Sequence, residues 1–357
     1  MVGGKYYCWL EYFIKRCADE EKASGIRVVD VVDIHNYPWY NNDAEALQLH
    51  RMYYDTDYDY PGANGLKTIN GGWDNSQTKE YIFKRINDWL NLHFGTNHGI
   101  TPGLSEWSPG PSEPNLASVI YASHLGTFAN NGVELFSPWT WFTGMWETLH
   151  LFSRNAKEYS VSSTSSLENT VSAYTTVNEA ADSMTVIIVN RDMSSNRNVS
   201  VNLNGFSVAS GSHKTLQLSS LPSTETFESD TDNTLKSSSV TVNSNSFTIS
   251  VPALSTTAIL LSKSETVTGI EEYRDQDVSI YPNPAFDKLI VGFDSKREET
   301  VEIIMCDPSG RRVASFQKYC DGITPITVDI SAIPNGFYLV SVRRAGRVSV
   351  AKFAVAR

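Results

Sequence analysis

Basic residues, cysteines and long apolar runs are scarce in this chain of 357 residues, and its eight tryptophans all lie at or before Trp146. The 29 Lys and Arg face 40 Asp and Glu, which gives a net charge of −11. Such a charge argues against a nucleic acid as partner, because binding phosphates needs clustered cations. Four cysteines are too few for a disulfide scaffold, and no apolar run approaches the roughly 18 residues of a transmembrane helix. A neutral or weakly polar ligand fits this composition best.

The residues up to about position 160 alternate between helical and strand patterns. Apolar residues at helical spacing predict helices at 10–24, 79–93 and 115–130, and apolar, β-branched runs predict strands at 26–34, 100–107 and 133–141. This order predicts three βα units with a parallel sheet, either doubly wound or part of a TIM-type barrel. No glycine-rich phosphate loop follows any of these strands in the sequence, which favours the barrel.

Aromatic and ionisable side chains follow each expected strand. They are His35, Tyr37 and Trp39 after the first strand, Glu106 and Trp107 at the end of the second, and Trp139 and Trp141 at the end of the third. In a barrel, the carboxyl ends of the strands meet in one cleft. Glycosidases place a carboxylate among aromatic rings, because the rings bind the apolar faces of sugars while the carboxylate acts at the anomeric carbon. Glu106 is therefore the candidate catalytic residue, and the other six are candidate substrate contacts.

Structural roles remain open for the same residues. Glu106 could cap the helix that follows it or pair with an arginine, and the four tryptophans could pack in a core. Asp30 and Asp33 could support the site through hydrogen bonds or only balance a nearby Arg or Lys. Glu113 and Glu134 are further carboxylates, for which a loop charge and an ion pair are the simpler expectations.

The series VVDVVDIHNYP, RINDWL, GLSEW and VELFSPWTW resembles the second half of glycoside hydrolase family 44, and the resemblance continues to TTAILLS. That family comprises endoglucanases and xyloglucanases with a TIM-like barrel and an attached β-sandwich. The resemblance implies that Glu106 is the nucleophile in retaining hydrolysis of a β-linked glucan such as cellulose or xyloglucan, with Tyr37 beside it. Ser105, Trp107 and Ser108 stand where the family commonly has Thr, Tyr and Asn. No cofactor is expected, and no spaced carboxylate loop predicts a bound metal ion.

A retaining mechanism needs a second carboxyl group as acid/base. In the family this glutamate lies on an earlier barrel strand, and neither Glu113 nor Glu134 matches its position. A complete TIM barrel takes about 250 residues, against roughly 160 here before the sandwich begins. The N-terminus, MVGGKYYCWLEYF, also lacks the basic start, apolar middle and cleavage site of a signal peptide. We therefore expect that half of the barrel precedes Met1 and that this chain alone hydrolyses no glucan.

Beyond the barrel segment, residues 1–160, β-branched residues alternate with polar ones. This pattern predicts an antiparallel β-sandwich at 161–263, a linker at 264–276 and a small Ig-like β-sandwich at 277–357. The last unit carries YPNP, DPSGR and NGFYLVSV in that order, and it resembles the C-terminal sorting domain of the type IX (Por) secretion system of Bacteroidetes. That resemblance implies export to the outer-membrane surface or the medium, with the secretion machinery as a partner of 277–357.

Two functions of different class are compatible with this sequence. In the first, the whole protein is a secreted endo-β-1,4-glucanase or xyloglucanase of which this chain is a part. In the second, the chain is a non-catalytic glucan-binding or cell-surface protein that retains an aromatic platform. A third interpretation is an unrelated small α/β enzyme with Glu106 as general base.

Overall fold

The computed structural model describes residues 7–264, 278–293, 298–321, 324–344 and 347–357. They belong to two compact units, residues 1–264 and 265–357. In the part of the chain that is described, no helix is long and apolar enough to cross a membrane.

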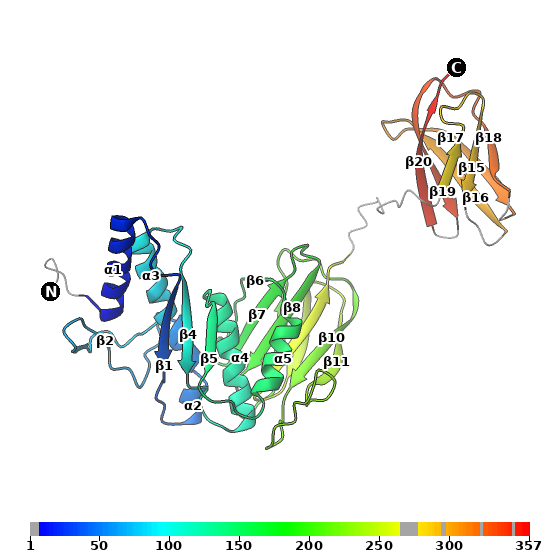
Figure 1. Cartoon of the computed structure of the whole chain (residues 1–357). Coiled ribbons are helices and arrows are strands. Elements are labelled where there is room, and N and C mark those ends of the chain that lie inside the picture. The colour runs from blue at the N-terminus through cyan, green and yellow to red at the C-terminus, as the bar shows by residue number, and fades with distance from the viewer. Residues whose placement is uncertain (1–6, 265–277, 294–297, 322–323, 345–346) are drawn as a thin grey trace. The chain divides into compact units, whose positions relative to one another are not determined.

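The first unit begins with a parallel sheet flanked by helices (Figure 1). The strands are β1 (Val31–Asn36), β4 (Thr101–Trp107) and β5 (Leu135–Pro138), hydrogen-bonded in the order β1-β4-β5. The helices are α1 (Trp9–Ser24), α3 (Ile82–Phe94), α4 (Pro114–Asn130) and α5 (Met145–Asn155). Short elements lie between β1 and α3: α2 (Asp43–Ala46), a 3-10 helix (Leu49–Tyr53), β2 (Leu66–Lys67) and β3 (Trp73–Asp74). The predicted alternation of helices and parallel strands is confirmed, but these three strands form an open sheet rather than a closed barrel.

The strand boundaries differ from the sequence prediction most at the start of β1 and at the end of β5. The strand expected from residue 26 begins only at Val31, and Ile26 and Val28 before it are 66 % and 45 % exposed. The strand expected to reach residue 141 ends at Pro138. The β-branched run at 26–34 therefore begins before the hydrogen-bonded strand β1. Trp139 and Trp141 follow β5 instead of belonging to it.

Helix α4 is buried on all sides, with every residue from Leu116 to Phe128 shielded from solvent. The Glu113 carboxylate accepts a hydrogen bond from the backbone N–H of Leu116 at 2.8 Å, so Glu113 is the N-terminal cap of α4. A Cβ at Gly126 would lie 2.2 Å from the ring of Tyr174 on a second sheet. Glycine at this position is what allows the helix and that sheet to pack so closely.

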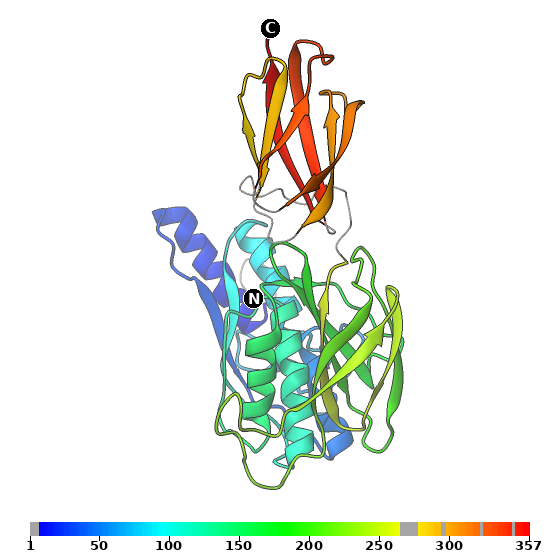
Figure 2. The ribbon, with the colours of Figure 1, turned by 90° about the vertical axis from the view of Figure 1, so that its right-hand side faces the viewer.

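This second sheet is antiparallel, has six strands and packs on α4 and α5 (Figure 2). Its order is β11 (Lys236–Val242), β10 (Gly211–Leu218), β13 (Ser255–Ser262), β8 (Ser183–Asn190), β7 (Val171–Val177) and β6 (Tyr159–Val161). One face adds Ile187 and Leu218 to the core around the helices. The other face adds Ile188 and Ile259 to a core shared with the antiparallel strand pair β9 (Arg197–Asn202) and β12 (Ser246–Val251). The segments 1–160 and 161–263, expected as two domains, thus lie in one compact unit.

The second unit consists of two antiparallel sheets around a core of its own. One sheet holds β14 (Val278–Tyr281), β15 (Lys288–Phe293) and β18 (Ile326–Asp329), and the other holds β17 (Arg312–Cys320), β16 (Glu299–Cys306), β19 (Gly336–Arg344) and β20 (Arg347–Val355). In the DPSGR turn, the Asp307 carboxylate accepts hydrogen bonds from the backbone N–H groups of Ser309 and Arg311. Gly310 has φ +83°, a conformation that favours glycine. The two-sheet architecture expected for 277–357 is present.

A buried polar network connects α4 to the antiparallel sheet. The buried Arg191 guanidinium donates hydrogen bonds to Ser123 Oγ at 3.1 Å and Ser172 Oγ at 2.6 Å. The rings of His50 and His124 lie close by, with centroids 6.5 Å apart. Burial, assisted by the charge of Arg191, lowers the pKa of His124 to about 4 and holds the pKa of His50 well below its usual value. Both imidazoles are therefore neutral near pH 7.

We expect the first unit to lose stability as the pH falls from about 6.5 to about 4. In this window the unfolded chain binds protons that the folded state excludes, so the free energy of unfolding falls by about 1.4 kcal/mol per pH unit for each histidine. Urea unfolding at several pH values, followed by tryptophan fluorescence, measures the slope. The variant His124→Phe should flatten it, whereas His150→Asn, at a half-buried position on α5, should not. Equal slopes in the wild type and His124→Phe would contradict this account.

Candidate active site

The candidate site lies at the carboxyl end of β4, where the strand contains one extra residue. Against β1, Ile34 is opposite Leu104 but His35 is opposite Glu106, so Ser105 has no counterpart. The register shifts at the same place against β5. Such a β-bulge changes which face the following side chains occupy. Leu104 and Trp107 are both fully buried, whereas Ser105 and Glu106 between them are partly exposed.

Asp33 of β1 holds this bulge in place. Its Oδ1 accepts a hydrogen bond from the backbone N–H of Ser105 at 2.8 Å, and its Oδ2 accepts one from Ser105 Oγ at 2.5 Å. Gly103 makes room for the carboxylate, because a Cβ there would lie 2.9 Å from Val31 Cγ1 and 3.3 Å from Asp33 Oδ1. The support through hydrogen bonds that the sequence left open for Asp33 is therefore present.

Glu106 is contacted by two side chains from the end of β1. The Tyr37 hydroxyl donates a hydrogen bond to Glu106 Oε2 at 2.8 Å, and His35 Nδ1 lies 3.3 Å from the same oxygen. The Glu106 side chain is 32 % exposed, and Oε1 has no hydrogen bond with any of the described residues. Partial desolvation and the hydrogen bond to Glu106 raise the pKa of Tyr37, so its phenol remains a donor. The arrangement fixes one carboxylate oxygen and leaves the other open to solvent.

Exposed tryptophans follow the ends of strands β1 and β5. Trp39 and Trp139 are 61 % and 68 % exposed, and the backbone N–H of Trp139 donates to the carbonyl of Trp107 at 2.9 Å, which places Trp139 beside the end of β4. Trp141 stacks on Trp146 with ring centroids 4.1 Å apart and an interplanar angle of 7°. The sequence did not single out Trp146, which lies in the first turn of α5 and remains 42 % exposed. Trp146 follows the loop after an expected strand and lies in the first turn of a helix, and this position is the signal that could have identified it.

Trp107 requires a correction, because it was expected to contact substrate. It is completely buried, and its ring stacks on His124 and Tyr121 of α4 with centroids 4.7 and 5.9 Å away. The bulge at Ser105 turns Trp107 away from the Glu106 face and into the core. Its role in this structure is to pack the strand end against α4.

Three of the other candidate residues contact one another, and Trp39 makes a separate contact. His35, Tyr37 and Glu106 are in contact with one another through Glu106 Oε2. Trp39 instead has its backbone carbonyl hydrogen-bonded by the Tyr60 hydroxyl at 2.5 Å, which fixes the loop after β1. Over the described residues, no group of three or more His, Cys, Asp or Glu side chains is arranged to hold a metal ion.

Residues 279–356 match the family described as the secretion system C-terminal sorting domain. The comparison with curated proteins found no match. This match and the two-sheet structure together define the second unit as a sorting domain of that family.

The chain is also similar to solved structures of glycoside hydrolases. A xyloglucanase of family 44 from Paenibacillus polymyxa has a TM-score of 0.59 and 18 % identity, covering 73 % of this chain and 52 % of that one. An endoglucanase of family 44 from Clostridium thermocellum has a TM-score of 0.57 and 17 % identity, covering 71 % and 51 %. A bifunctional glucanase-xylanase from a metagenome library has a TM-score of 0.58 and 18 % identity, covering 72 % and 48 %. The chain thus shares their fold and spans about half of the length of these structures.

We expect Asp33→Ala to lower the free energy of unfolding of the chain by about 1 kcal/mol, because two hydrogen bonds at the bulge lose their acceptor. Asp30→Ala is the matched control, since the exposed Asp30 side chain pairs with Arg27 on the surface and should change stability little. Urea denaturation of both variants measures the difference. Equal losses would mean that the Asp33 contacts do not stabilise the bulge.

Proposed function

We propose that residues 1–264 belong to a secreted retaining endo-β-1,4-glucanase or xyloglucanase in which Glu106 is the nucleophile. The observation that supports this most strongly is the position of the Glu106 carboxylate at the end of a parallel strand. There the Tyr37 hydroxyl and His35 Nδ1 both contact Glu106 Oε2. The similarity of fold to family 44 glycoside hydrolases favours the same chemistry.

In the proposed reaction, Glu106 Oε1 attacks the anomeric carbon of a glucan bound along the tryptophans. The bond to the leaving sugar breaks as the second carboxyl group of a retaining enzyme protonates the departing oxygen, and a covalent glycosyl-enzyme forms. The same group then takes the proton of the water that hydrolyses this intermediate. Tyr37 donates to Oε2 and so orients the carboxylate. Because only Oε2 is held, the rotation of the carboxylate is restricted and Oε1 is left available.

The exposed rings of Trp39, Trp139 and Trp141 are the proposed sugar contacts. Flat apolar rings suit the apolar faces of β-linked glucose units, and burying such a ring against a sugar removes apolar area from water. The stacking of Trp141 on Trp146 holds both rings nearly parallel. A non-catalytic glucan-binding protein could use the same rings, so the decisive question is whether Glu106 reacts.

A test of the nucleophile should not depend on the second carboxyl group, which a retaining enzyme places about 5 to 5.5 Å from the first. A 2,4-dinitrophenyl 2-deoxy-2-fluoro-β-cellobioside meets this need, because dinitrophenolate leaves without being protonated and the fluorine slows release of the glycosyl group. We expect mass spectrometry of the digested protein to find one fluorocellobiosyl group on Glu106.

Three variants sharpen this test. Glu106→Gln should abolish labelling, and Tyr37→Phe should slow it about ten-fold, the effect of losing one hydrogen bond to a charged group. Glu134→Gln is the matched carboxylate control and should label normally. A label on another residue, or binding of cellobiose with no label at all, would contradict the assignment, and the second outcome would favour the non-catalytic glucan-binding protein.

We further propose that the second unit directs export through the type IX secretion machinery to the cell surface or the medium, as its family match suggests. A reporter protein with an inner-membrane signal peptide, fused to residues 264–357, should reach the surface or medium of a bacterium that has this system. The same reporter fused to residues 264–278 alone should stay in the periplasm. Equal location of the two fusions would count against a sorting role.

A further inference from the structure

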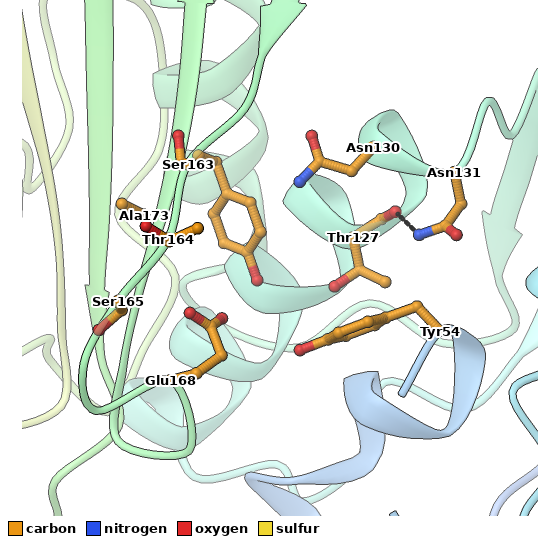
Figure 3. A pocket seen from close by; sticks show the side chains of 10 residues that line it. Tyr54, Thr127, Asn130, Asn131, Ser163, Thr164, Ser165, Glu168 and Ala173 are labelled. Carbon is orange, nitrogen blue, oxygen red and sulfur yellow. Dashed lines mark hydrogen bonds between the residues drawn. The ribbon is translucent and has the colours of Figure 1, made fainter. Parts of the chain in front are cut away.

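A pocket of about 310 Å³ opens between the end of α4 and the loop before β7 (Figure 3). Its position relative to Glu106 can be described along strand β4. After α4, the backbone N–H of Glu134 donates to the carbonyl of Pro102 at the start of β4, whereas Glu106 is near the end of that strand. The pocket and the candidate active site are therefore toward opposite ends of β4.

The pocket wall presents hydrogen-bond donors from two elements. Asn130 Oδ1 accepts a hydrogen bond from Ser160 Oγ at 2.7 Å, which orients the side chain so that its amide nitrogen points into the pocket (Figure 3). Tyr54, from the connection after β1, contributes its phenol from the other side. Burial raises the pKa of Tyr54, so this phenol stays protonated.

The floor holds a hydroxyl with unused bonding capacity. Thr127 is only 2 % exposed, and its Oγ1 is within reach of the Tyr174 hydroxyl, which leaves further bonding capacity on the Thr127 oxygen. The Tyr174 hydroxyl itself donates to the carbonyl of Ser123 at 3.1 Å. A ligand hydroxyl would use the remaining capacity of the Thr127 oxygen.

The acceptor in the pocket is the Glu168 carboxylate, which is fixed before any ligand arrives. Ser172 Oγ donates to Glu168 Oε1, and the buried Arg191 donates both to Ser172 Oγ and to the Glu168 carbonyl. A pre-positioned acceptor loses little freedom on binding, which favours affinity.

These groups select the chemical class of the ligand. The carboxylate of Glu168 disfavours anions, and a single carboxylate provides too few ligands for a metal ion, in agreement with the absence of metal-ligand clusters from the described ranges. Donors, an acceptor and a tyrosine ring together suit a molecule rich in hydroxyl groups. The volume is at the lower end of small-molecule sites, about 300 to 1,000 Å³, and has room for one or two sugar residues.

We propose that this pocket binds a neutral saccharide of one or two residues, separately from the surface around Glu106. The site is an additional saccharide subsite between the helical layer and the antiparallel sheet. It does not depend on whether Glu106 is a nucleophile, because none of its groups takes part in that reaction.

Titration of ¹⁵N-labelled protein carrying Glu106→Gln with cellobiose tests the proposal. We expect saturable shifts of the Asn130 side-chain amide, assigned by its loss in Asn130→Ala, with Kd on the order of 1 mM. Glucuronate, whose carboxylate would face Glu168, should shift this amide at least five-fold less at equal concentration.

Two variants and one control decide where the sugar binds. Thr127→Val keeps the shape of the side chain and should weaken the binding that the Asn130 amide reports about five-fold, as Glu168→Gln should. Trp139→Ala, at the other end of β4, should leave it unchanged. The proposal is overturned if cellobiose does not shift the Asn130 amide, or if Trp139→Ala removes the shift while Thr127→Val and Glu168→Gln do not.

Discussion

The candidate active site depends on one extra residue, Ser105 in β4. In a regular strand side chains alternate between faces, so Glu106 would share the buried face of Leu104 and Trp107 would point the other way. The bulge reverses both placements. Asp33 satisfies the backbone and side-chain donors of Ser105, and the missing side chain of Gly103 gives that carboxylate its space. This local arrangement allows the end of β4 to pack Trp107 into the core and to expose the Glu106 carboxylate.

The same strand shows how far sequence patterns reach. Apolar composition located β4 to within one residue, expected at 100–107 and found at Thr101–Trp107, because its first half is continuously buried. The contact between Tyr37 and Glu106 agrees with the family resemblance. Trp107 was misplaced because patterns of period two contain no information about a bulge. Trp146 was missed because its stacking on Trp141 depends on a loop whose path the sequence does not specify.

The boundary near residue 160 illustrates a different limit. Composition changes there, since no tryptophan follows Trp146 and β-branched residues alternate with polar ones beyond the boundary. Packing does not change with it, because α4 is covered by the antiparallel sheet and Arg191 donates hydrogen bonds to Ser123 and Ser172 on the two sides. Contacts between residues so distant in sequence cannot be recognised from local sequence patterns. The two segments nevertheless share one core.

The complete burial of α4 also affects how such a chain can evolve by exchange of segments. A recombination event that replaced the antiparallel sheet would uncover a helix with no polar face from Leu116 to Phe128. It would also leave Arg191 or its partners without a counterpart. The sheet and the helical segment must therefore be inherited together. The sorting domain, in contrast, packs around a core of its own.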